Sequence, residues 1–216
     1  MEIKIELSKA INFHQQGNLK EAKKIYEDIL KTNPHLAEIH LNLGIILKSM
    51  NKLEEADESI SKAISLKPNF DLAYYHMGNT KYKLKKFDES EYIYKKVISL
   101  NSKFVEAYIN LSRAQSCLLY TSDAAAEEDS VLKAINLNPN YALSYLNYGL
   151  ILQELGDLSN AKVALQKSLE LNSNSFLTKY NLDILLKQID LLKKIGLELN
   201  INNLANIDFK KKFSNN

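Results

Sequence analysis

Residues 37–70 read AEIHLNLGIILKSMNKLEEADESISKAISLKPNF, and their pattern sets the architecture of the whole chain. Apolar residues return at three- and four-residue steps on both sides of a polar break near Asn51, which is typical of two amphipathic helices. Antiparallel helices approach closely where the facing residues are small, as at Gly44 and Ala56. Pro68 cannot continue a helix, so the chain turns after the second one. The segment therefore predicts a helix hairpin.

The pattern recurs along the chain with a period of about 34 residues. Pro34 and Pro68 stand one period apart, and Pro139 follows after two further periods and three surplus residues. Self-similarity at such a fixed period indicates a solenoid built from one repeated supersecondary element. Numbering the positions of each repeat from 1 to 34 places five repeats at residues 3–36, 37–70, 71–104, 105–141 and 142–175.

Small residues recur at position 8 of the repeats and, with one exception, at position 20. Position 8 holds Ala10, Gly44, Gly78, Ser112 and Gly149, and position 20 holds Ala22, Ala56, Ser90, Glu127 and Ala161. The break between the helices contains Gly17-Asn18 and Gly156-Asp157, where a glycine ends one helix and a polar residue is suited to open the next. One hairpin cannot bury its own apolar face, so the repeats are expected to stack.

These residues resemble the tetratricopeptide repeat, which has a large residue at position 4, Leu-Gly at 7 and 8, Ala at 20 and 27, and Pro at 32. The second repeat follows this pattern with His40, Leu43-Gly44, Ala56, Ala63 and Pro68. The resemblance covers about four fifths of the chain, with departures at Ile29, Ser102 and Ser173. It implies an all-α, right-handed α-solenoid of about five helix hairpins plus a C-terminal helix.

The residues after the fifth repeat are predicted to begin a sixth first helix. Apolar residues in 176–196 cover more than one helical stripe, whereas a terminal repeat should be polar on its outside. We therefore expect a capping or interface helix that packs under residues 197–209, contacts another copy of the chain, or leads into a further domain. Residues 197–216 are expected to form a tail.

The three surplus residues of the fourth repeat fall within 116–128. One interpretation makes Ser122 or Asp123 the N-cap of a second helix that residues 124–126 lengthen by about one turn, because alanine favours helix. The run 117–125 also resembles the translated end of a sequencing adaptor, which would make the phase slip an assembly artefact.

The resemblance further implies that positions 2, 5, 6, 9, 12 and 13 of each first helix line a concave groove, called here the expected binding face. Position 6 forms a column of amides interrupted by one histidine: Asn42, His76, Asn110, Asn147 and Asn181. Each amide offers a donor and an acceptor to an extended peptide. The column resembles the asparagine ladder of O-linked N-acetylglucosamine transferases, although a structural role is the alternative. The surrounding candidates are Leu41, Ile45, Leu72, Tyr75, Asn79, Tyr82, Ile109, Arg113, Leu146 and Leu150.

Two other kinds of site have little support in the sequence. The family's carboxylate clamp needs Lys or Arg and Asn at positions 5 and 9, where only Asn79 and Arg113 offer such groups. The four histidines, His14, His35, His40 and His76, lack the partner spacing of a metal or nucleophile site. We therefore predict no catalytic residue, no metal site and no cofactor, and we do not expect an enzyme.

The composition argues against several classes of partner. Lys and Arg number 28 and Asp and Glu number 26, giving a net charge of +2, which is too balanced for binding nucleic acid or anionic membrane by bulk charge. Apolar runs stay far below the roughly 20 residues that cross a bilayer, and the N-terminus lacks a secretory apolar core. The single Cys117 suits a reducing compartment. A cytoplasmic protein without nucleic-acid or membrane partners is expected.

The sequence thus favours a non-catalytic scaffold that binds a protein or an extended peptide in its concave groove. The alternative is the N-terminal substrate-recognition arm of a truncated glycosyltransferase or sulfotransferase, because similar arrays precede such domains. In either case the C-terminal helix can join a further domain or form a homo-oligomer.

Overall fold

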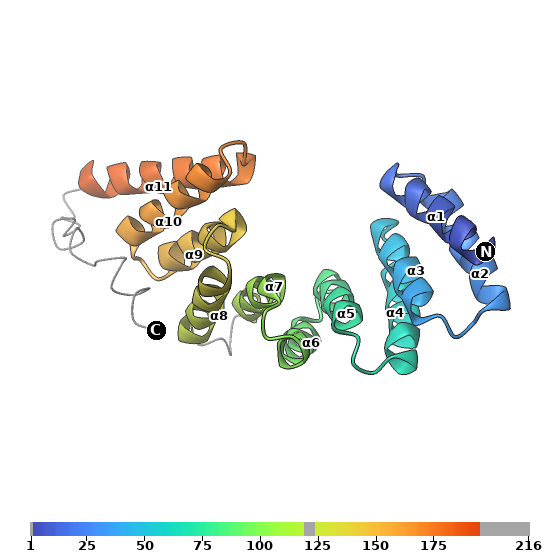
Figure 1. Cartoon of the computed structure of the whole chain (residues 1–216). Coiled ribbons are helices and arrows are strands. Elements are labelled where there is room, and N and C mark those ends of the chain that lie inside the picture. Colours follow the sequence, from blue (N-terminus) through green and yellow to red (C-terminus); the bar gives the residue numbers. More distant parts are fainter. Residues whose placement is uncertain (1, 119–123, 195–216) are drawn as a thin grey trace. The chain divides into compact units, whose positions relative to one another are not determined.

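The computed structural model describes residues 2–118 and 124–194, and within these ranges it contains eleven α-helices and no strand (Figure 1). The helices are α1 (Glu2–Gln15), α2 (Leu19–Thr32), α3 (Ala37–Ser49), α4 (Leu53–Leu66), α5 (Asp71–Lys83), α6 (Phe87–Leu100), α7 (Val105–Ser116), α8 (Ala124–Leu137), α9 (Ala142–Glu154), α10 (Leu158–Leu171) and α11 (Phe176–Lys194). The predicted all-α character is confirmed. The chain divides into two compact parts, an N-terminal half (Met1–Ala107) and a C-terminal half (Tyr108–Asn216).

The turn inside a hairpin has the same backbone conformation in four of the repeats. The residue at position 15 has a left-handed backbone conformation in each of them, with φ of +78° at Gly17, 60° at Asn51 and Lys85, and +81° at Gly156. The next amide donates to the carbonyl five residues before it, as from Asn18 to Phe13 at 2.8 Å. Together with the bond from the position-15 amide to the carbonyl three residues back, this is a Schellman motif. The prediction that the polar breaks are helix ends is confirmed.

The residues that follow these turns differ in how they open the second helix. Asp157 caps α10, because its Oδ1 accepts from the backbone amide of Asn160 at 3.2 Å. Asn18 makes no side-chain bond to the first turn of α2. The expected capping role therefore holds for the aspartate and not for the asparagine, whose side chain instead donates to Gln16 at 3.4 Å.

Of the four residues in the left-handed conformation, Lys85 destabilises the folded state most, because its Cβ clashes with the backbone in that conformation. We expect Lys85→Gly to stabilise the N-terminal half by about 1 kcal/mol. The reciprocal change, Gly17→Lys, should destabilise by a similar amount, although no neighbouring atom lies within 4 Å of an added Cβ. Urea unfolding of both variants measures this, and a destabilised Lys85→Gly would contradict the backbone origin of the effect.

Helix α8 contains the three alanines, 124–126, that were expected to belong to the second helix of the fourth repeat. It has 14 residues, as α2, α4, α6 and α10 have. The proposed N-cap residues Ser122 and Asp123 lie outside the described residues.

In the N-terminal half, the helices pack through buried side chains at the points where small residues let them approach. One cluster joins α1 to α4 around Tyr26 and Ile46, and another joins α3, α4 and α5 around Ile60. A Cβ added at Gly44 would lie 2.5 Å from Ile60 Cγ1, and one at Gly78 would lie 2.6 Å from the Tyr94 ring. The predicted need for small residues at position 8 is explained by these contacts.

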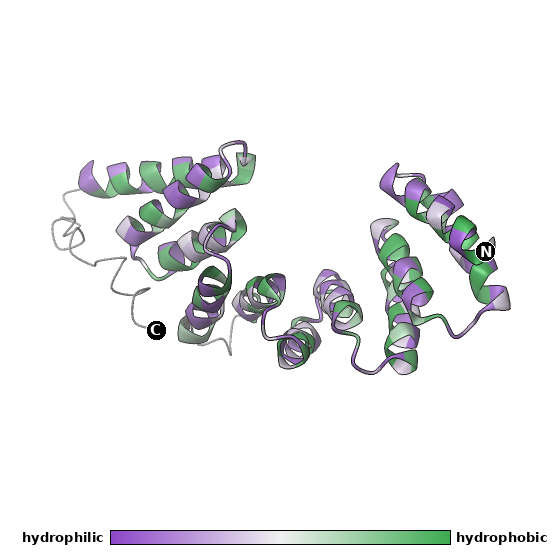
Figure 2. Cartoon of the chain, in the orientation of Figure 1, coloured by the Kyte–Doolittle hydropathy of each residue, from purple (hydrophilic) through white to green (hydrophobic). Residues whose placement is uncertain are grey.

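In the C-terminal half, α8 to α11 share one apolar cluster around Leu165 and Leu185. Helix α11 adds the hydroxyl of Thr178, which lies 3.2 Å from the Ser168 hydroxyl of α10. Hydrophobic and hydrophilic bands alternate along α11 (Figure 2). Its apolar residues do not all turn inward, since Phe176 is 80% exposed.

Candidate functional site

In the N-terminal half, α3 and α5 provide the expected binding face, and these two helices are in direct contact. Most of its side chains are partly exposed: Asn42 and Ile45 from α3, and Tyr75, His76, Asn79 and Tyr82 from α5. Leu72 is exposed, whereas Leu41 is buried with 2% exposure. The structure thus brings polar and aromatic groups of two repeats together above a buried leucine.

Aromatic packing positions the α5 side of this face. The Tyr75 ring centroid lies 4.9 Å from that of Phe104 and 5.4 Å from that of His76 in an edge-to-face arrangement. The hydroxyl of buried Tyr94 donates to Asn79 Oδ1 at 2.8 Å. Because Tyr94 is held in the core, it ties the orientation of Asn79 to the packing of α6 on α5.

Lys48 adds a cation to this face that the sequence analysis did not select. It occupies position 12 of α3, and its Nζ donates to Nδ1 of His76 at 3.1 Å. Burial, reinforced by the charge of Lys83, lowers the pKa of Lys48 to about 8. Burial and the charge of Lys48 lower the pKa of His76 to about 4, so the imidazole is neutral at pH 7. Inspecting position 12 in every repeat would have found this lysine.

The depressed pKa of His76 predicts a loss of stability in acid. The unfolded chain takes up this proton near pH 6.5, whereas the folded state resists it until about pH 4. The contribution of the neutral imidazole to the free energy of unfolding is therefore fully present above pH 6.5 and is lost as the pH falls towards 4. This contribution is about 2 kcal/mol after allowing for the partial exposure of the ring. Urea unfolding between pH 7 and 4 should show a steeper decline for the wild type than for His76→Gln. Parallel declines would contradict this assignment.

In the C-terminal half, the candidate residues occupy different environments. Ile109 and Leu146 are buried at 1% and 3% exposure, so they belong to the core. Asn147 is 9% exposed, and its Nδ2 has no hydrogen-bond partner among the described residues. Leu150 is partly exposed, and Arg113 is exposed.

The other two position-6 asparagines of this half form side-chain hydrogen bonds within their own helices. Asn110 Oδ1 accepts from Nη1 of Arg113 at 3.4 Å, and Asn181 Nδ2 donates to the carbonyl of Leu177 at 2.8 Å. The amides at position 6 are therefore not equivalent. Asn42 is the partly exposed member whose side chain makes no hydrogen bond to any described residue.

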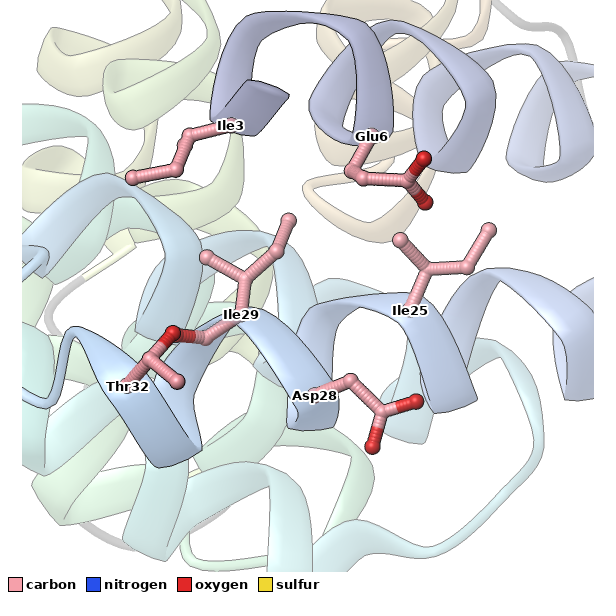
Figure 3. Close-up of a pocket in the computed structure, with 6 residues that line it drawn as sticks. All are labelled: Ile3, Glu6, Ile25, Asp28, Ile29 and Thr32. Atoms are coloured by element: carbon pink, nitrogen blue, oxygen red, sulfur yellow. The ribbon is translucent and has the colours of Figure 1, made fainter.

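A separate pocket of about 310 Å³ lies between α1 and α2 (Figure 3). Ile25 and Ile29 point from α2 towards α1, and Ile3, Glu6, Asp28 and Thr32 complete the lining. Position 4 carries a ring in the next four repeats, and here it carries Glu6, so no ring fills the space. The carboxylates of Glu6 and Asp28 each pair with a lysine of their own helix at 2.7 Å. None of the six residues occupies a position of the expected binding face.

Two further kinds of feature are absent from the part of the chain that the structure describes. No three His, Cys, Asp or Glu side chains gather there in a way that could hold a metal ion. None of the helices described is both long and apolar enough to span a bilayer.

Solved structures with a similar fold were found, although no curated protein matches the chain. MamA from Desulfovibrio magneticus RS-1 is 19% identical with a TM-score of 0.70, over 81% of this chain and 97% of that one. TTC0263, a TPR protein in Thermus thermophilus, is 15% identical with a TM-score of 0.70, over 85% and 98%. YrrB, described as "a TPR protein with an unusual peptide-binding site", is 16% identical with a TM-score of 0.62, over 82% and 89%. At these identities, the similarity establishes the fold as an all-α solenoid.

Sequence models described as "Tetratricopeptide repeat" match residues 13–82, 72–104 and 131–162. Together these matches cover more than half of the chain, and they include both the N-terminal and the C-terminal half. The helix hairpins, the Schellman turns and the small residues at position 8 agree with them. The chain belongs to the tetratricopeptide repeat family.

Proposed function

We propose that this protein is a non-catalytic scaffold that binds an extended peptide of a partner protein along its first-helix faces. The observation that carries the proposal is the side chain of Asn42. It is partly exposed next to buried Leu41, and it makes no hydrogen bond to any described residue. Its amide therefore keeps a donor and an acceptor for a ligand, as pairing with a peptide backbone requires.

The neighbouring side chains and one similar structure support the same interpretation. Tyr75, Tyr82 and Ile45 are only partly covered, so they offer apolar area on the same expected binding face as the polar Asn42. YrrB, which shares the fold, is described as having a peptide-binding site. The proposal includes a cytoplasmic location, which the single Cys117 and the balanced charge suit.

Selection from a display library of random dodecapeptides tests this proposal. The wild type should enrich peptides that Asn42→Ala binds about tenfold more weakly, because one backbone hydrogen-bond pair to the amide is lost. Asn110→Ala/Asn147→Ala tests the C-terminal half in the same way. Each variant is compared by fluorescence anisotropy with the best enriched peptide.

Asn136→Ala is the matched control, since Asn136 is an exposed asparagine on the second helix α8. It should bind like the wild type. If no peptide is enriched, or if Asn42→Ala and Asn136→Ala bind alike, the Asn42 amide has no role in binding and the proposal fails.

A further inference from the structure

Lys48 differs from Lys81, a partly buried lysine at position 11 of the third repeat, in having no carboxylate partner among the described residues. Lys81 of α5 is also largely covered, but its Nζ lies 2.9 Å from Asp57 Oδ2 and 2.9 Å from Glu89 Oε2. Burial lowers the pKa of Lys81, but the hydrogen bonds to Glu89 and Asp57 outweigh it and raise that pKa overall. Within the described ranges, the charge of Lys48 is met only by the neutral imidazole of His76.

A partly buried ammonium without a counter-ion is costly to the folded protein, because burial removes hydration that no opposite charge replaces. A second cation, Lys83, lies close enough to act on Lys48, and it is exposed at position 13 of α5. With Nδ1 of His76 accepting from Lys48, the proton of the neutral ring resides on Nε2, which makes that atom a further donor. Three donors, two of them charged, thus lie at positions 6, 12 and 13 of the expected binding face.

We propose that Lys48, His76 and Lys83 bind the carboxylate of an aspartate or glutamate side chain in the extended peptide. This inference rests on the proposed function, since it assumes that a peptide passes over α3 and α5. Charge complementarity identifies the partner: a carboxylate accepts from all three groups and neutralises an ammonium that has no acidic neighbour in the described structure.

An acidic side chain within the peptide fits the site formed by Lys48, His76 and Lys83 better than the carboxylate at the peptide's C-terminus does. Asn42 and His76 hold the same position in adjacent repeats, so a peptide main chain that pairs with Asn42 continues past His76. Partly exposed Ile45 and Tyr75 flank the cations and accept apolar neighbours of the acidic residue. The predicted ligand is therefore an extended segment with one acidic residue among apolar ones.

Acetate is the simplest probe of the anion site and requires no peptide. We expect acetate, and not chloride at equal ionic strength, to shift the NMR signals of the His76 ring and the Lys48 side chain, with a dissociation constant on the order of 10 mM. Lys48→Met should abolish the shift of the His76 ring. Lys62→Met, which removes an exposed lysine of α4, changes the net charge equally and should keep it. An equal response to chloride, or a response that survives in Lys48→Met, would overturn the anion site.

Three dodecapeptide pools, the first two capped at both ends, then test the source of the carboxylate. One pool has a central glutamate, the second a central glutamine, and the third a central glutamine with a free C-terminal carboxylate. The wild type should bind the glutamate pool about tenfold more tightly than the second pool, and Lys48→Met should bind the two alike. Preference for the third pool overturns the choice of a side chain.

The two proposals fail in different ways in these experiments. Equal binding of all three pools by the wild type overturns the acidic specificity and leaves peptide binding intact. Shifts with acetate but no binding of any pool contradict the proposed function and leave the anion site standing. Folding is checked by urea unfolding: Lys48→Met should be at least as stable as the wild type, whereas Lys81→Met loses two ion pairs and should be less stable.

Discussion

Leu185→Asp is expected to release α11 from the C-terminal half and to raise the hydrogen-exchange rate of its amides about a thousandfold. Leu185 is fully buried in the cluster that joins α11 to α9 and α10. A carboxylate placed there would have no counter-charge in that apolar cluster, at a cost of about 4 kcal/mol. Because α11 follows α10 and packs mainly against that helix, we expect local opening rather than unfolding of the whole half.

Ile184→Asp is the matched control for this change. Ile184 precedes Leu185 on the same helix and is 39% exposed, so the same carboxylate there stays in contact with water. Its exchange rates should stay within a few-fold of the wild-type rates. Exchange mass spectrometry that finds the two variants equally protected, or equally open, would show that Leu185 does not hold α11 in place.

Gly78→Leu is expected to destabilise the N-terminal half by about 3 kcal/mol. A Cβ at this position would lie 2.6 Å from Cε1 of Tyr94, and that ring is only 1% exposed, so it has little room to move. Overpacking of this kind forces side chains out of their rotamers or helices apart. Any displacement of Tyr94 also breaks its hydrogen bond to Asn79, which connects the core to the expected binding face.

Ser61→Leu supplies the comparison, since Ser61 is an exposed helical residue of α4 with room for a larger side chain. Thermal unfolding should show a clear decrease in midpoint for Gly78→Leu and almost none for Ser61→Leu. A Gly78→Leu variant as stable as the wild type would mean that α5 and α6 do not approach as closely as the structure places them.

The repeat architecture could be predicted from the sequence because its causes are local or periodic. The left-handed residues Gly17 and Gly156, the small residues at position 8 and the prolines at position 32 each act through backbone geometry or size, and each recurs at a fixed spacing.

The candidate site was only partly predictable, because its properties depend on burial and on contacts between repeats. The residues at position 6 look alike in the sequence, yet Asn147 is buried, Asn181 bonds to its own helix and Asn42 keeps a free amide. Lys48 and His76 come from different repeats and have no motif in common, so only their contact in the structure connects them.

The amino-acid sequence by itself determined the helix hairpins, their turns and their number, since the fixed repeat period records which faces must be apolar and where the chain must bend. Only the tertiary structure decided which polar groups became available to a ligand. Whether Lys48 meets a carboxylate or a neutral ring depends on which side chains the neighbouring helix places beside it, and its hydration depends on how deeply that contact is buried.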